Sequence, residues 1–380
     1  MTVLSASWVH MPATQAAASL LSEGGHQVWF VGGCVRNTLM EMPVTDIDMC
    51  TDAPPDRVME LAKASGIKVI PTGLDHGTVT LVIDNQPFEV TTLRRDVETD
   101  GRRAVVAFSD NLEEDARRRD FTINALYALP DGTVVDPLGG MPDLRERRVR
   151  FIEVPEDRIK EDALRILRFF RFTATHADPD LGIDAEGLAA CAELADRIDG
   201  LSKERIGQEM RKLLAAKNPS MALSAMERSG ALMRVLPGAT AASVAPLVHV
   251  EDMLDLAPDH LRRLAVMGGE HAQQNLRLAN SETRQLALYL TDQSDPARNG
   301  YKYGETTALG ILALHAASFG ENPSEEAIAA VRHAARQRFP LTGDDFSSRL
   351  KGKAIGDALA LAEDRWIASG FTLTRDDLLA

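Results

Sequence analysis

The chain has 380 residues, of which 44% are hydrophobic and 26% charged, and its formal net charge at pH 7 is −14. This composition is ordinary for a globular protein, and the length is sufficient for two or more domains with substantial cores. No apolar run approaches the ~20 residues that a membrane-spanning helix needs, and the N-terminus lacks the basic-then-apolar layout of a secretory signal. The sequence therefore predicts a cytoplasmic protein and excludes one that spans a membrane.

The cysteines and arginines limit the kinds of partner. Cys34, Cys50 and Cys191 are odd in number and have no CxxC spacing, which favours small buried thiols over a disulfide or a zinc site. The net negative charge argues at first against a nucleic-acid partner. The arginines are nevertheless clustered in the first half of the chain, so one surface could still bind RNA. The clusters are Arg94-Arg95, Arg102-Arg103, Arg117 to Arg119, and Arg145 to Arg150.

The first predicted elements lead to a glycine turn. A helical stretch from Ala13 to Glu23 is followed by the apolar run Val28–Val31, which predicts a buried strand. This strand ends at Gly32-Gly33, and a short helix that carries Arg36 should follow. Two glycines at this point let backbone N–H groups approach a phosphate at the start of the helix.

Two aspartates come next, in a second apolar segment. Asp46-Ile47-Asp48 predicts a strand on which both aspartates share one face, because strand side chains alternate. Two carboxylates beside a glycine turn and an arginine could hold a divalent metal against a triphosphate. Taken alone, a Gly-Gly pair is most often a turn and Asp-x-Asp a polar strand face. Their joint spacing favours a functional site.

This joint pattern resembles the class II tRNA nucleotidyltransferase and bacterial poly(A) polymerase family, whose signature is GGxVRD followed by DxDxxT. Gly32 to Arg36 and Asp46 to Thr51 match that signature. Asn37 stands where the family usually has Asp, so the acceptor oxygen is kept but the charge is lost. The resemblance implies a polymerase β-like catalytic head, with Gly33 and Arg36 on the triphosphate.

Residues 54–106 predict further strands of the head. A helix should run from Pro55 to Ala64, followed by a strand over residues 67–70 and a loop over residues 72–77. Two strands, Thr78–Ile83 and Phe88–Leu93, are joined by a turn over residues 84–87. Glu89 is either a third acid of the metal site or a surface residue of an edge strand. Residues 96–106 are polar and aperiodic, which predicts a mobile loop beside the site or plain disorder.

Residues 111–129 are predicted to be helical and include Arg118 to Ala125, which matches the family's second motif, RRDFTxNA. The resemblance implies that Arg119 lies against phosphate and that Asp120 and Asn124 lie near the sugar. A hairpin turn over residues 130–132 comes next. Residues 136–144 resemble a third motif, DPxxGxxDL, and are expected to form a rigid joint.

From Pro155 onward the pattern is helical. On a single helix over residues 161–171, Asp162 and Arg165 lie on one side, opposite an apolar stripe. The two could form an ordinary intrahelical salt bridge. They could also select a base, because a carboxylate only accepts and a guanidinium only donates hydrogen bonds. The pair would then suit cytosine and adenine and leave guanine and uracil unpaired. The apolar stripe is Ala163, Ile166, Leu167 and Phe170.

The same stretch resembles the family's nucleotide-template motif, EDxxRxxRF. This implies base selection by protein side chains, with Arg168 and Arg171 reaching the base or the phosphates. Residues 197–214 resemble a fifth motif and are expected to brace the base-reading helix. The candidate RNA contacts there are Lys203, Arg205, Arg211 and Lys212. Beyond residue 215, a helical bundle could carry the RNA, and Arg262-Arg263 are either phosphate contacts or part of a solvated face.

Together these inferences predict an α+β protein with a mixed catalytic sheet followed by helices. We expect a nucleotidyltransferase head over residues 1–145, a helical neck over 146–215, and a helical body and tail that binds tRNA over 216–380. The resemblance implies addition of CCA from CTP and ATP to the tRNA 3′ end, with Asp46 and Asp48 around two Mg²⁺ ions and Glu89 as the candidate third acid. The alternatives are a poly(A) polymerase, a C-only or A-only enzyme, and an inactive RNA-binding protein. Because poly(A) polymerases of the family tend to have a basic C-terminal tail, the acidic end of this chain favours tRNA.

Overall fold

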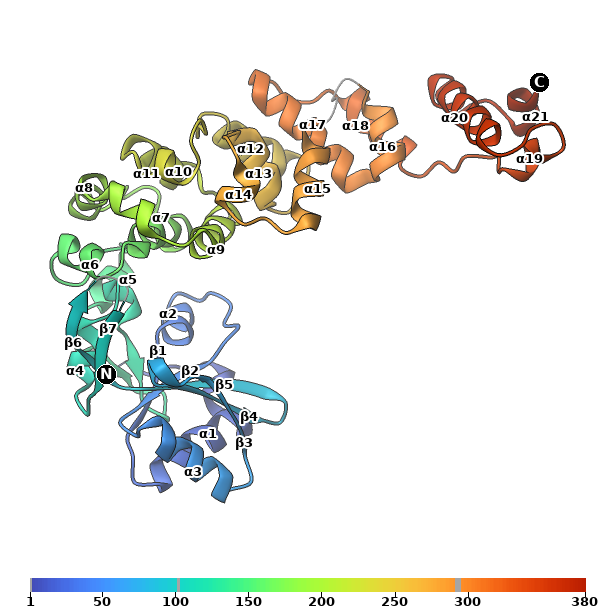
Figure 1. Cartoon of the computed structure of the whole chain (residues 1–380). Coiled ribbons are helices and arrows are strands. Elements are labelled where there is room, and N and C mark those ends of the chain that lie inside the picture. The colour runs from blue at the N-terminus through green and yellow to red at the C-terminus, as the bar shows by residue number, and fades with distance from the viewer. Residues whose placement is uncertain (1, 101–102, 291–294) are drawn as a thin grey trace. The chain divides into compact units, whose positions relative to one another are not determined.

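The computed structural model of the chain describes residues 2–100, 103–290 and 295–380. The chain forms two compact units. The N-terminal unit contains the residues up to Ile206 together with Arg228–Val235, and the C-terminal unit contains Gly207–Glu227 and Leu236–Ala380. Within the described residues, all strands belong to the N-terminal unit (Figure 1). The domain boundaries at residues 145 and 215 stay predictions.

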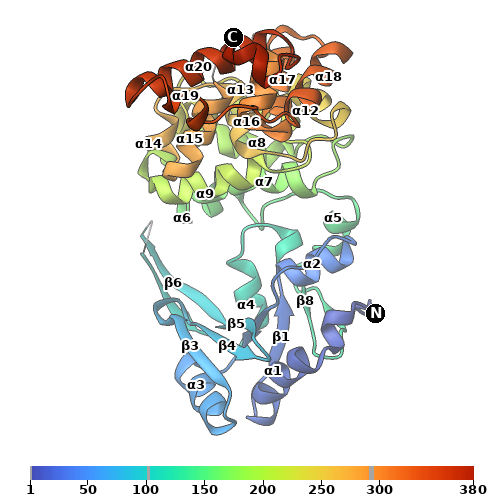
Figure 2. The same ribbon diagram turned by 90° about the vertical axis from the view of Figure 1, so that its right-hand side faces the viewer.

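A seven-stranded mixed sheet forms the base of the N-terminal unit. Its strand order is β3-β4-β5-β2-β1-β8-β9, in which β2 and β5 are parallel and the other neighbours are antiparallel. Helices α1 (Pro12–Glu23) and α3 (Pro55–Ala64) cover one face, and α2 (Gly33–Leu39) lies on the other (Figures 1 and 2). The predicted mixed sheet is confirmed. The strands are β1 (Val28–Val31), β2 (Asp48–Thr51), β3 (Lys68–Gly73), β4 (Thr78–Ile83), β5 (Gln86–Thr92), β8 (Tyr127–Ala128) and β9 (Val134–Val135).

The core of this sheet explains why the apolar run at residue 28 forms a strand. All four residues of β1 are buried. Trp29 and Val31 pack in one cluster with Cys50, Leu93 and Tyr127. Burial of each large apolar side chain contributes about 1.5–3 kcal/mol. The central strand is therefore held on both of its faces, and the glycine turn at its end has a fixed position. All three cysteines of the chain are buried, as expected.

The prediction of an aperiodic loop over residues 96–106 is wrong. Strands β6 (Arg94–Asp100) and β7 (Arg103–Phe108) form a separate antiparallel ribbon, with Arg94 opposite Phe108. Residues 101 and 102 of the predicted loop lie outside the described residues. A ribbon is held by backbone hydrogen bonds, which polar residues make as well as apolar ones. The missing apolar alternation therefore did not exclude strands.

The prediction of one helix over residues 111–129 is also wrong. Helix α4 (Leu112–Arg117) ends early, and a short 3₁₀ turn, η3 (Thr122–Asn124), and β8 come after it. The backbone N–H of Thr122 donates to the carbonyl of Arg150 (3.0 Å), and Phe121 forms a β-bridge with Phe151. These tertiary partners take the backbone groups that a continued helix would have used.

Two smaller boundaries differ from the prediction as well. β3 extends to Gly73 and is followed by a 3₁₀ turn, η2 (Leu74–His76), where a loop was expected. The hairpin between β4 and β5 turns at Asp84-Asn85, both of which have positive φ (50° and 63°). This is the two-residue turn that the twist of a hairpin favours, so it is tighter than the four residues predicted.

The predicted continuous helix over residues 161–171 is broken at Asp162. Helix α6 (Pro155–Glu161) ends there, Asp162 is extended (φ −151°, ψ 106°), and α7 (Leu164–His176) begins two residues later. The carboxylate of Asp162 accepts the N–H of Leu164 (3.1 Å), which is the capping contact that Asp commonly makes. The apolar stripe of α7 is buried as predicted at Ile166, Leu167 and Phe170.

The remaining helices confirm that the chain is helical after residue 155. Within the described residues, no helix combines the length and the apolar character that crossing a bilayer requires. The N-terminal unit also contains η1 (Ser7–His10), α5 (Met141–Arg145), α8 (Ala185–Glu193), η4 (Ala195–Gly200) and α11 (Ala231–Val235). The others are α9 (Lys203–Leu214), α10 (Ser220–Arg228), α12 (Val244–Met253), α13 (His260–Met267), α14 (Ala272–Asn275), α15 (Asn280–Tyr289), α16 (Pro296–Tyr303), α17 (Glu305–Phe319), α18 (Glu325–Ala334), α19 (Asp344–Ser347), α20 (Lys353–Ala368) and α21 (Arg375–Leu379).

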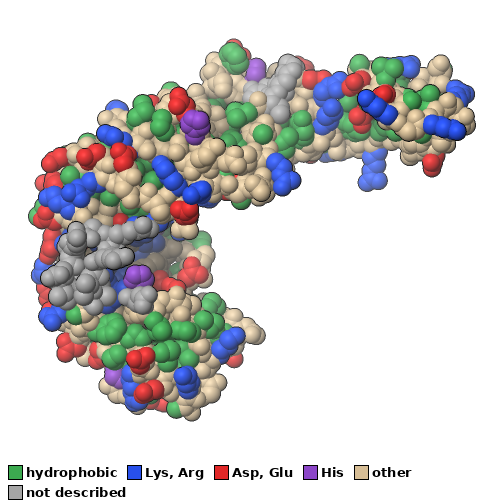
Figure 3. Space-filling view, viewed as in Figure 1, with side chains coloured by type: hydrophobic (Ala, Val, Ile, Leu, Met, Phe, Trp, Pro, Cys, Tyr) green, Lys and Arg blue, Asp and Glu red, His purple; other side chains and the backbone are tan. Residues whose placement is uncertain are grey.

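Two arginines of the C-terminal unit are not where the sequence suggested. Arg262 and Arg263, expected as phosphate contacts or a solvated face, are both 1% exposed. They share one buried carboxylate, Glu251, at 2.7 and 2.9 Å. On the face drawn in Figure 3, basic and acidic side chains are interspersed over the described C-terminal helices.

Candidate active site

The glycine turn lies against two guanidinium groups. Gly32 has φ 70° and ψ −119°, a conformation that disfavours any residue with a Cβ atom. A Cβ atom at Gly32 would lie 3.6 Å from the nearest guanidinium nitrogen of Arg119, and one at Gly33 would lie 4.0 Å from that of Arg36. The turn thus has no side chains and lies beside two guanidinium groups, an arrangement that favours the binding of an anion.

Asp48 and Glu89 form a carboxylate pair on neighbouring strands. They are directly paired residues of the parallel strands β2 and β5, so their side chains lie on the same face. Burial, and next the charge of Glu89, raise the pKa of Asp48 to about 6, although Arg119 acts in the opposite direction. The structure therefore places Glu89 beside Asp48, as the prediction of a third acid at the metal site required.

Asp46 lies outside the strand on which it was predicted. β2 begins at Asp48, and Asp46 is exposed in the preceding segment, where its carboxylate accepts the hydroxyl of Thr45 (3.0 Å). Its charge still contributes to the raised pKa of Asp48. The prediction from strand alternation is therefore wrong for Asp46, although its charge acts on Asp48. Its role as a metal ligand stays a prediction.

Arg119 is held by a buried carboxylate that the sequence motifs did not indicate. Asp115 is 2% exposed and accepts hydrogen bonds from Arg119 (2.9 Å) and from the hydroxyl of Tyr127 (2.9 Å). Burial opposes ionisation of Asp115, but Arg119, the hydrogen bond from Tyr127 and the charge of Arg118 together outweigh it and lower the pKa of the carboxyl. Asp115 therefore keeps Arg119 charged and directed at the glycine turn.

A chain of hydrogen bonds joins α2 to α7 through the RRDFTxNA segment. Arg36 donates to the side-chain oxygen of Asn124 (2.5 Å), and Asn124 donates to Asp120 (2.8 Å). Arg168 donates to the other oxygen of Asp120 (2.7 Å). Burial opposes the charge of Asp120, but Arg168, the hydrogen bond from Asn124 and the charge of Arg165 together outweigh it and lower the pKa of Asp120. The structure thus brings together four of the predicted nucleotide-binding residues.

Asn37 keeps the acceptor role expected of it and adds a donor. Its side-chain oxygen accepts two hydrogen bonds from Arg36 (3.0 and 2.7 Å). Its amide nitrogen donates to the carbonyl of Pro43 (2.8 Å), which lies in the segment that leads to Asp46. The amide therefore links Arg36 to that segment without neutralising the guanidinium.

We expect Asn37→Ala to lower kcat/KM for nucleotide about tenfold, because it removes an acceptor of a charged donor and the contact with Pro43. Asn37→Asp should be milder, at about threefold, because it keeps the acceptor oxygen for Arg36 although it loses the donor to Pro43 and adds a negative charge beside the guanidinium. Steady-state kinetics with CTP and ATP measure both effects. Equal losses in the two variants would contradict the separate roles assigned to the oxygen and the nitrogen.

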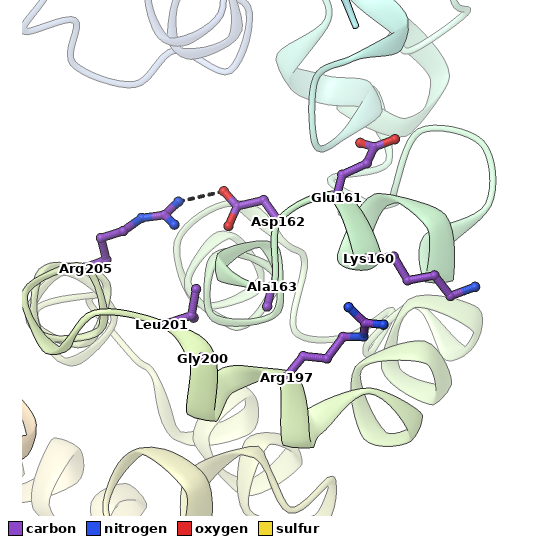
Figure 4. Close-up of a pocket in the computed structure, with 8 residues that line it drawn as sticks. All are labelled: Lys160, Glu161, Asp162, Ala163, Arg197, Gly200, Leu201 and Arg205. Carbon is purple, nitrogen blue, oxygen red and sulfur yellow. Dashed lines mark hydrogen bonds and ion pairs between the residues drawn. The ribbon is translucent and has the colours of Figure 1, made fainter. Parts of the chain in front are cut away.

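Asp162 and Arg165 do not pair with each other. Asp162 binds Arg205 (2.6 Å), whereas Arg165 binds Glu161 (2.5 Å) and donates to the carbonyl of Arg118 (2.6 Å). The break between α6 and α7 separates the two side chains, so they do not form the intrahelical salt bridge that the sequence allowed. Figure 4 shows the carboxylate of Asp162 directed at Arg205, while Glu161 points elsewhere.

Asp162 and Arg205 line an open cavity of about 270 Å³ within the N-terminal unit (Figure 4). Its wall carries both signs of charge, since Lys160 and Arg197 also contribute. Arg165 is not among its lining residues. The full lining is Lys160, Glu161, Asp162, Ala163, Arg197, Gly200, Leu201 and Arg205.

The four predicted RNA-binding residues of α9 differ in their surroundings. Arg211 forms a two-pronged ion pair with Glu282 (2.7 and 2.8 Å) and donates to the carbonyl of Arg277. Its donors are therefore used within the C-terminal unit. Arg205 is paired with Asp162, Lys203 is half-buried and Lys212 is exposed. Lys212 is thus the most exposed of the four, and the RNA-binding role of all four stays a prediction.

Comparison with known proteins places this geometry in a family. Residues 28–150 match the protein-family model of the poly A polymerase head domain, and residues 180–243 match the model described as the probable RNA and SrmB-binding site of polymerase A. The mouse CCA tRNA nucleotidyltransferase 1, mitochondrial, is 30% identical over 384 aligned residues, which cover 96% of this chain and 88% of the mouse protein. The chain belongs to the CCA tRNA nucleotidyltransferase family.

Bacterial members and solved structures agree with this assignment. The CCA-adding enzyme of Oceanobacillus iheyensis is 42% identical over 217 residues, which cover 56% of this chain and 52% of that protein. The crystal structure of the Bacillus stearothermophilus CCA-adding enzyme in complex with CTP has a TM-score of 0.70 at 25% identity and covers 94% of this chain and 92% of that one. The Thermotoga maritima CCA-adding enzyme complexed with tRNA_CCA has the same fold, with a TM-score of 0.70 at 19% identity and coverage of 96% and 92%.

Members of this nucleotidyltransferase family use a divalent metal, and the carboxylates present fit such an ion. Within the described ranges, no three His, Cys, Asp or Glu side chains gather closely enough to hold a metal by themselves. Mg²⁺ is, however, commonly bound by only one or two protein carboxylates when substrate phosphates complete its coordination shell. Asp48 and Glu89 supply two such carboxylates side by side. A cation between them would relieve the repulsion that contributes to the raised pKa of Asp48.

We expect the affinity of the protein for Mg²⁺ to fall as the pH drops below about 6, because the proton on Asp48 then competes with the cation. The decrease should approach tenfold per pH unit, since one proton is displaced for each ion bound. Isothermal titration calorimetry between pH 5 and 8 measures it without nucleotide or RNA. An affinity that is constant over this range would contradict a metal-binding role for Asp48.

Proposed function

We propose that the protein adds CCA to the 3′ end of tRNA, using CTP and ATP and releasing pyrophosphate. The observation that carries this proposal is the convergence of the glycine turn, the Asp48–Glu89 pair and Arg119 in one site. The chain aligns with 88% of the mouse CCA tRNA nucleotidyltransferase, so the alignment includes the catalytic region and most of the helical region. The mouse protein is named as mitochondrial, and a cytoplasmic location for this chain stays our prediction.

The chemistry is phosphoryl transfer. Asp46, Asp48 and Glu89 would hold two Mg²⁺ ions, which when bound lower the pKa of the attacking hydroxyl and neutralise charge on the phosphates. The 3′-hydroxyl of the RNA attacks the α-phosphate of the nucleotide, the bond to the β-phosphate breaks, and pyrophosphate leaves. The turn at Gly32-Gly33 lets the triphosphate approach the backbone closely. Arg36, Arg119, Arg168 and Arg171 hold its charge in place, and Asp120 and Asn124 lie beside the sugar.

Base selection is assigned to Asp162 and Arg165. The carboxylate would accept the exocyclic amino group of cytosine or adenine, and the guanidinium would donate to the neighbouring ring nitrogen. Guanine and uracil would leave like groups facing each other, and this is costly in a desolvated site. Both side chains would exchange their present partners, Arg205 and Glu161, for the base.

Arg165→Ala is expected to reduce discrimination against UTP and GTP by about 10–100-fold, since one hydrogen bond to a charged donor is lost. Arg205→Ala serves as the matched control, because Arg205 is the residue that Asp162 binds in the structure. Single-nucleotide incorporation assays with all four nucleotides measure the effect. If Arg205→Ala reduced discrimination against UTP and GTP and Arg165→Ala did not, the base-selecting role of Arg165 would be contradicted and would pass to Arg205.

The proposed function is tested with tRNA that lacks its CCA end. The pure protein is incubated with Mg²⁺ and each labelled nucleotide alone and then with CTP and ATP together, and the products are sequenced. We expect CCA and no further addition. A long A tract would indicate a poly(A) polymerase, termination after CC or a single A would indicate a partial activity, and no incorporation would indicate an inactive RNA-binding protein.

A further inference from the structure

Three arginines surround the ring of one buried phenylalanine in the N-terminal unit. The guanidinium carbons of Arg36, Arg168 and Arg171 lie 5.1, 5.2 and 4.3 Å from the ring centroid of Phe172. Arg36 comes from α2, whereas the other two come from α7. Each distance is within the ~6 Å at which the ring face attracts a cation. We call these four residues the arginine–phenylalanine cluster.

The ring of Phe172 is packed against two other rings. It is 4% exposed, packs against Phe121 at 5.2 Å between centroids and stacks on His176 at 5.0 Å. Burial and the charge of Arg36 lower the pKa of His176 to about 3, so the imidazole is neutral at physiological pH. The ring therefore has a defined orientation, and its stacking partner adds no charge.

The cluster gathers three positive side chains. Arg168 is ion-paired with Asp120 (2.5 Å), whereas the side chains to which Arg36 donates are uncharged. Arg36 donates its hydrogen bonds to two amides, Asn37 and Asn124, which position the guanidinium but carry no charge. Burial and repulsion by Arg171 lower the pKa of Arg36 to about 10. The side chain is therefore charged at neutral pH, but its charged form is less favourable than that of an exposed arginine. A carboxylate in the place of the ring would offset the repulsion between the guanidinium groups, but it would also cancel positive charge that attracts an anionic ligand.

We propose that Phe172 is a positioning residue for the nucleotide triphosphate. Its ring holds three guanidinium groups together and adds no negative charge of its own. The quadrupole of an aromatic face attracts cations, so the ring can hold the guanidinium groups close together without adding an anion that would compete with a polyphosphate. The inference rests on the proposed function for the identity of the ligand as a nucleotide.

The test is Phe172→Leu, which keeps an apolar side chain but removes the ring. We expect the Kd values for CTP, ATP and inorganic tripolyphosphate, measured without RNA, to rise about tenfold each, while kcat at saturating nucleotide changes less than about twofold. Phe172→Tyr, which keeps the ring face, should restore the wild-type Kd. Tripolyphosphate has no base or sugar, so its binding reports on the phosphates alone.

Phe151→Leu is the matched control. Phe151 is 2% exposed and packs against Phe121 at 5.0 Å, so it has comparable burial and a shared neighbour. Among the described residues, no arginine is stacked on the ring of Phe151. We expect its substitution to lower the melting temperature without changing the Kd for tripolyphosphate. Equal increases in Kd for Phe151→Leu and Phe172→Leu would overturn the proposal, because they would show only a loss of packing.

Fluorination separates electrostatics from packing if Phe172→Leu does not fold. Trifluorophenylalanine has nearly the shape of phenylalanine but a weakened ring quadrupole. At position 172 it should raise the Kd for tripolyphosphate in the same direction as Leu, and at position 151 it should not. An unchanged Kd at position 172 would overturn the inference even if the protein adds CCA normally. Conversely, a wild-type protein that adds no CCA but whose tripolyphosphate binding depends on Phe172 would contradict only the proposed function.

Discussion

Asp48→Asn is expected to reduce nucleotide incorporation by at least about a thousandfold while tRNA affinity stays within about a factor of two. The substitution removes a carboxylate that would hold a cation, and such a cation supplies several kcal/mol of transition-state stabilisation. The RNA contacts are expected elsewhere, so binding should not depend on this side chain. Single-turnover incorporation and equilibrium tRNA binding measure the two quantities.

The same variant should be more stable than the wild type. The folded-state pKa of Asp48 lies above its unfolded value of 3.8, so ionisation of this carboxyl opposes folding at neutral pH. After allowance for partial solvent exposure, Asn should add about 1–2 kcal/mol at pH 7.5 in the absence of metal and nucleotide. The gain should diminish as the pH falls through 6 toward 4, because the wild-type carboxyl then takes up its proton. Urea denaturation at several pH values measures it.

Asp52→Asn is the control for both measurements. Asp52 lies just beyond the other end of β2, where it accepts from the backbone N–H of Gln27 (3.0 Å) and contacts His26 (3.1 Å). It has no place in the proposed site, so incorporation should stay within about twofold of the wild type. Activity above about a tenth of the wild-type value in Asp48→Asn, or a parallel loss of tRNA binding, would contradict the role given to Asp48.

Glu251→Ala is expected to destabilise the C-terminal unit by about 3–5 kcal/mol. Glu251 is the shared partner of Arg262 and Arg263, and all three side chains are buried. Removal of the carboxylate leaves two cations without their counter-charge, and this costs far more than the loss of one contact. Arg263 also donates to the carbonyls of Leu214 (2.7 Å) and Lys217 (3.0 Å), so the end of α9 should loosen as well.

Glu305→Ala is the matched control for this prediction. Glu305 also pairs with an arginine, Arg332, at 3.3 Å, but the two side chains are 42% and 49% exposed. An exposed pair of this kind contributes no more than about 1 kcal/mol. Denaturant unfolding of the full chain, followed by circular dichroism, compares the two variants. Similar midpoints for both would show that the buried cluster does not stabilise the unit.

Arg262 and Arg263 show where sequence reasoning reaches its limit. Two adjacent arginines on a helix resemble a surface for phosphates, because isolated charges are seldom buried. Their burial depends on Glu251, which is 11 residues before Arg262, and on the carbonyl of Leu214, which is 49 residues before Arg263. No local pattern contains that information. Arg211 is a similar case, since its partner Glu282 is 71 residues away.

The sequence by itself determined the elements whose cause is local. Gly32-Gly33 after a buried apolar run, a second strand that carries Asp48 and the helical character beyond residue 155 arise from side-chain size, backbone freedom and periodicity, although the start of that strand was predicted two residues too early. Each depends on neighbours within a few residues.

Only the tertiary structure decided which charged groups meet. It broke the helix at Asp162, gave that carboxylate to Arg205 and placed Arg36 over the ring of Phe172. The physical reason is that ion pairs and cation–π contacts are selected by distance and burial in the folded chain. Several donors compete for each acceptor, and the two residues that finally interact can be far apart in the sequence.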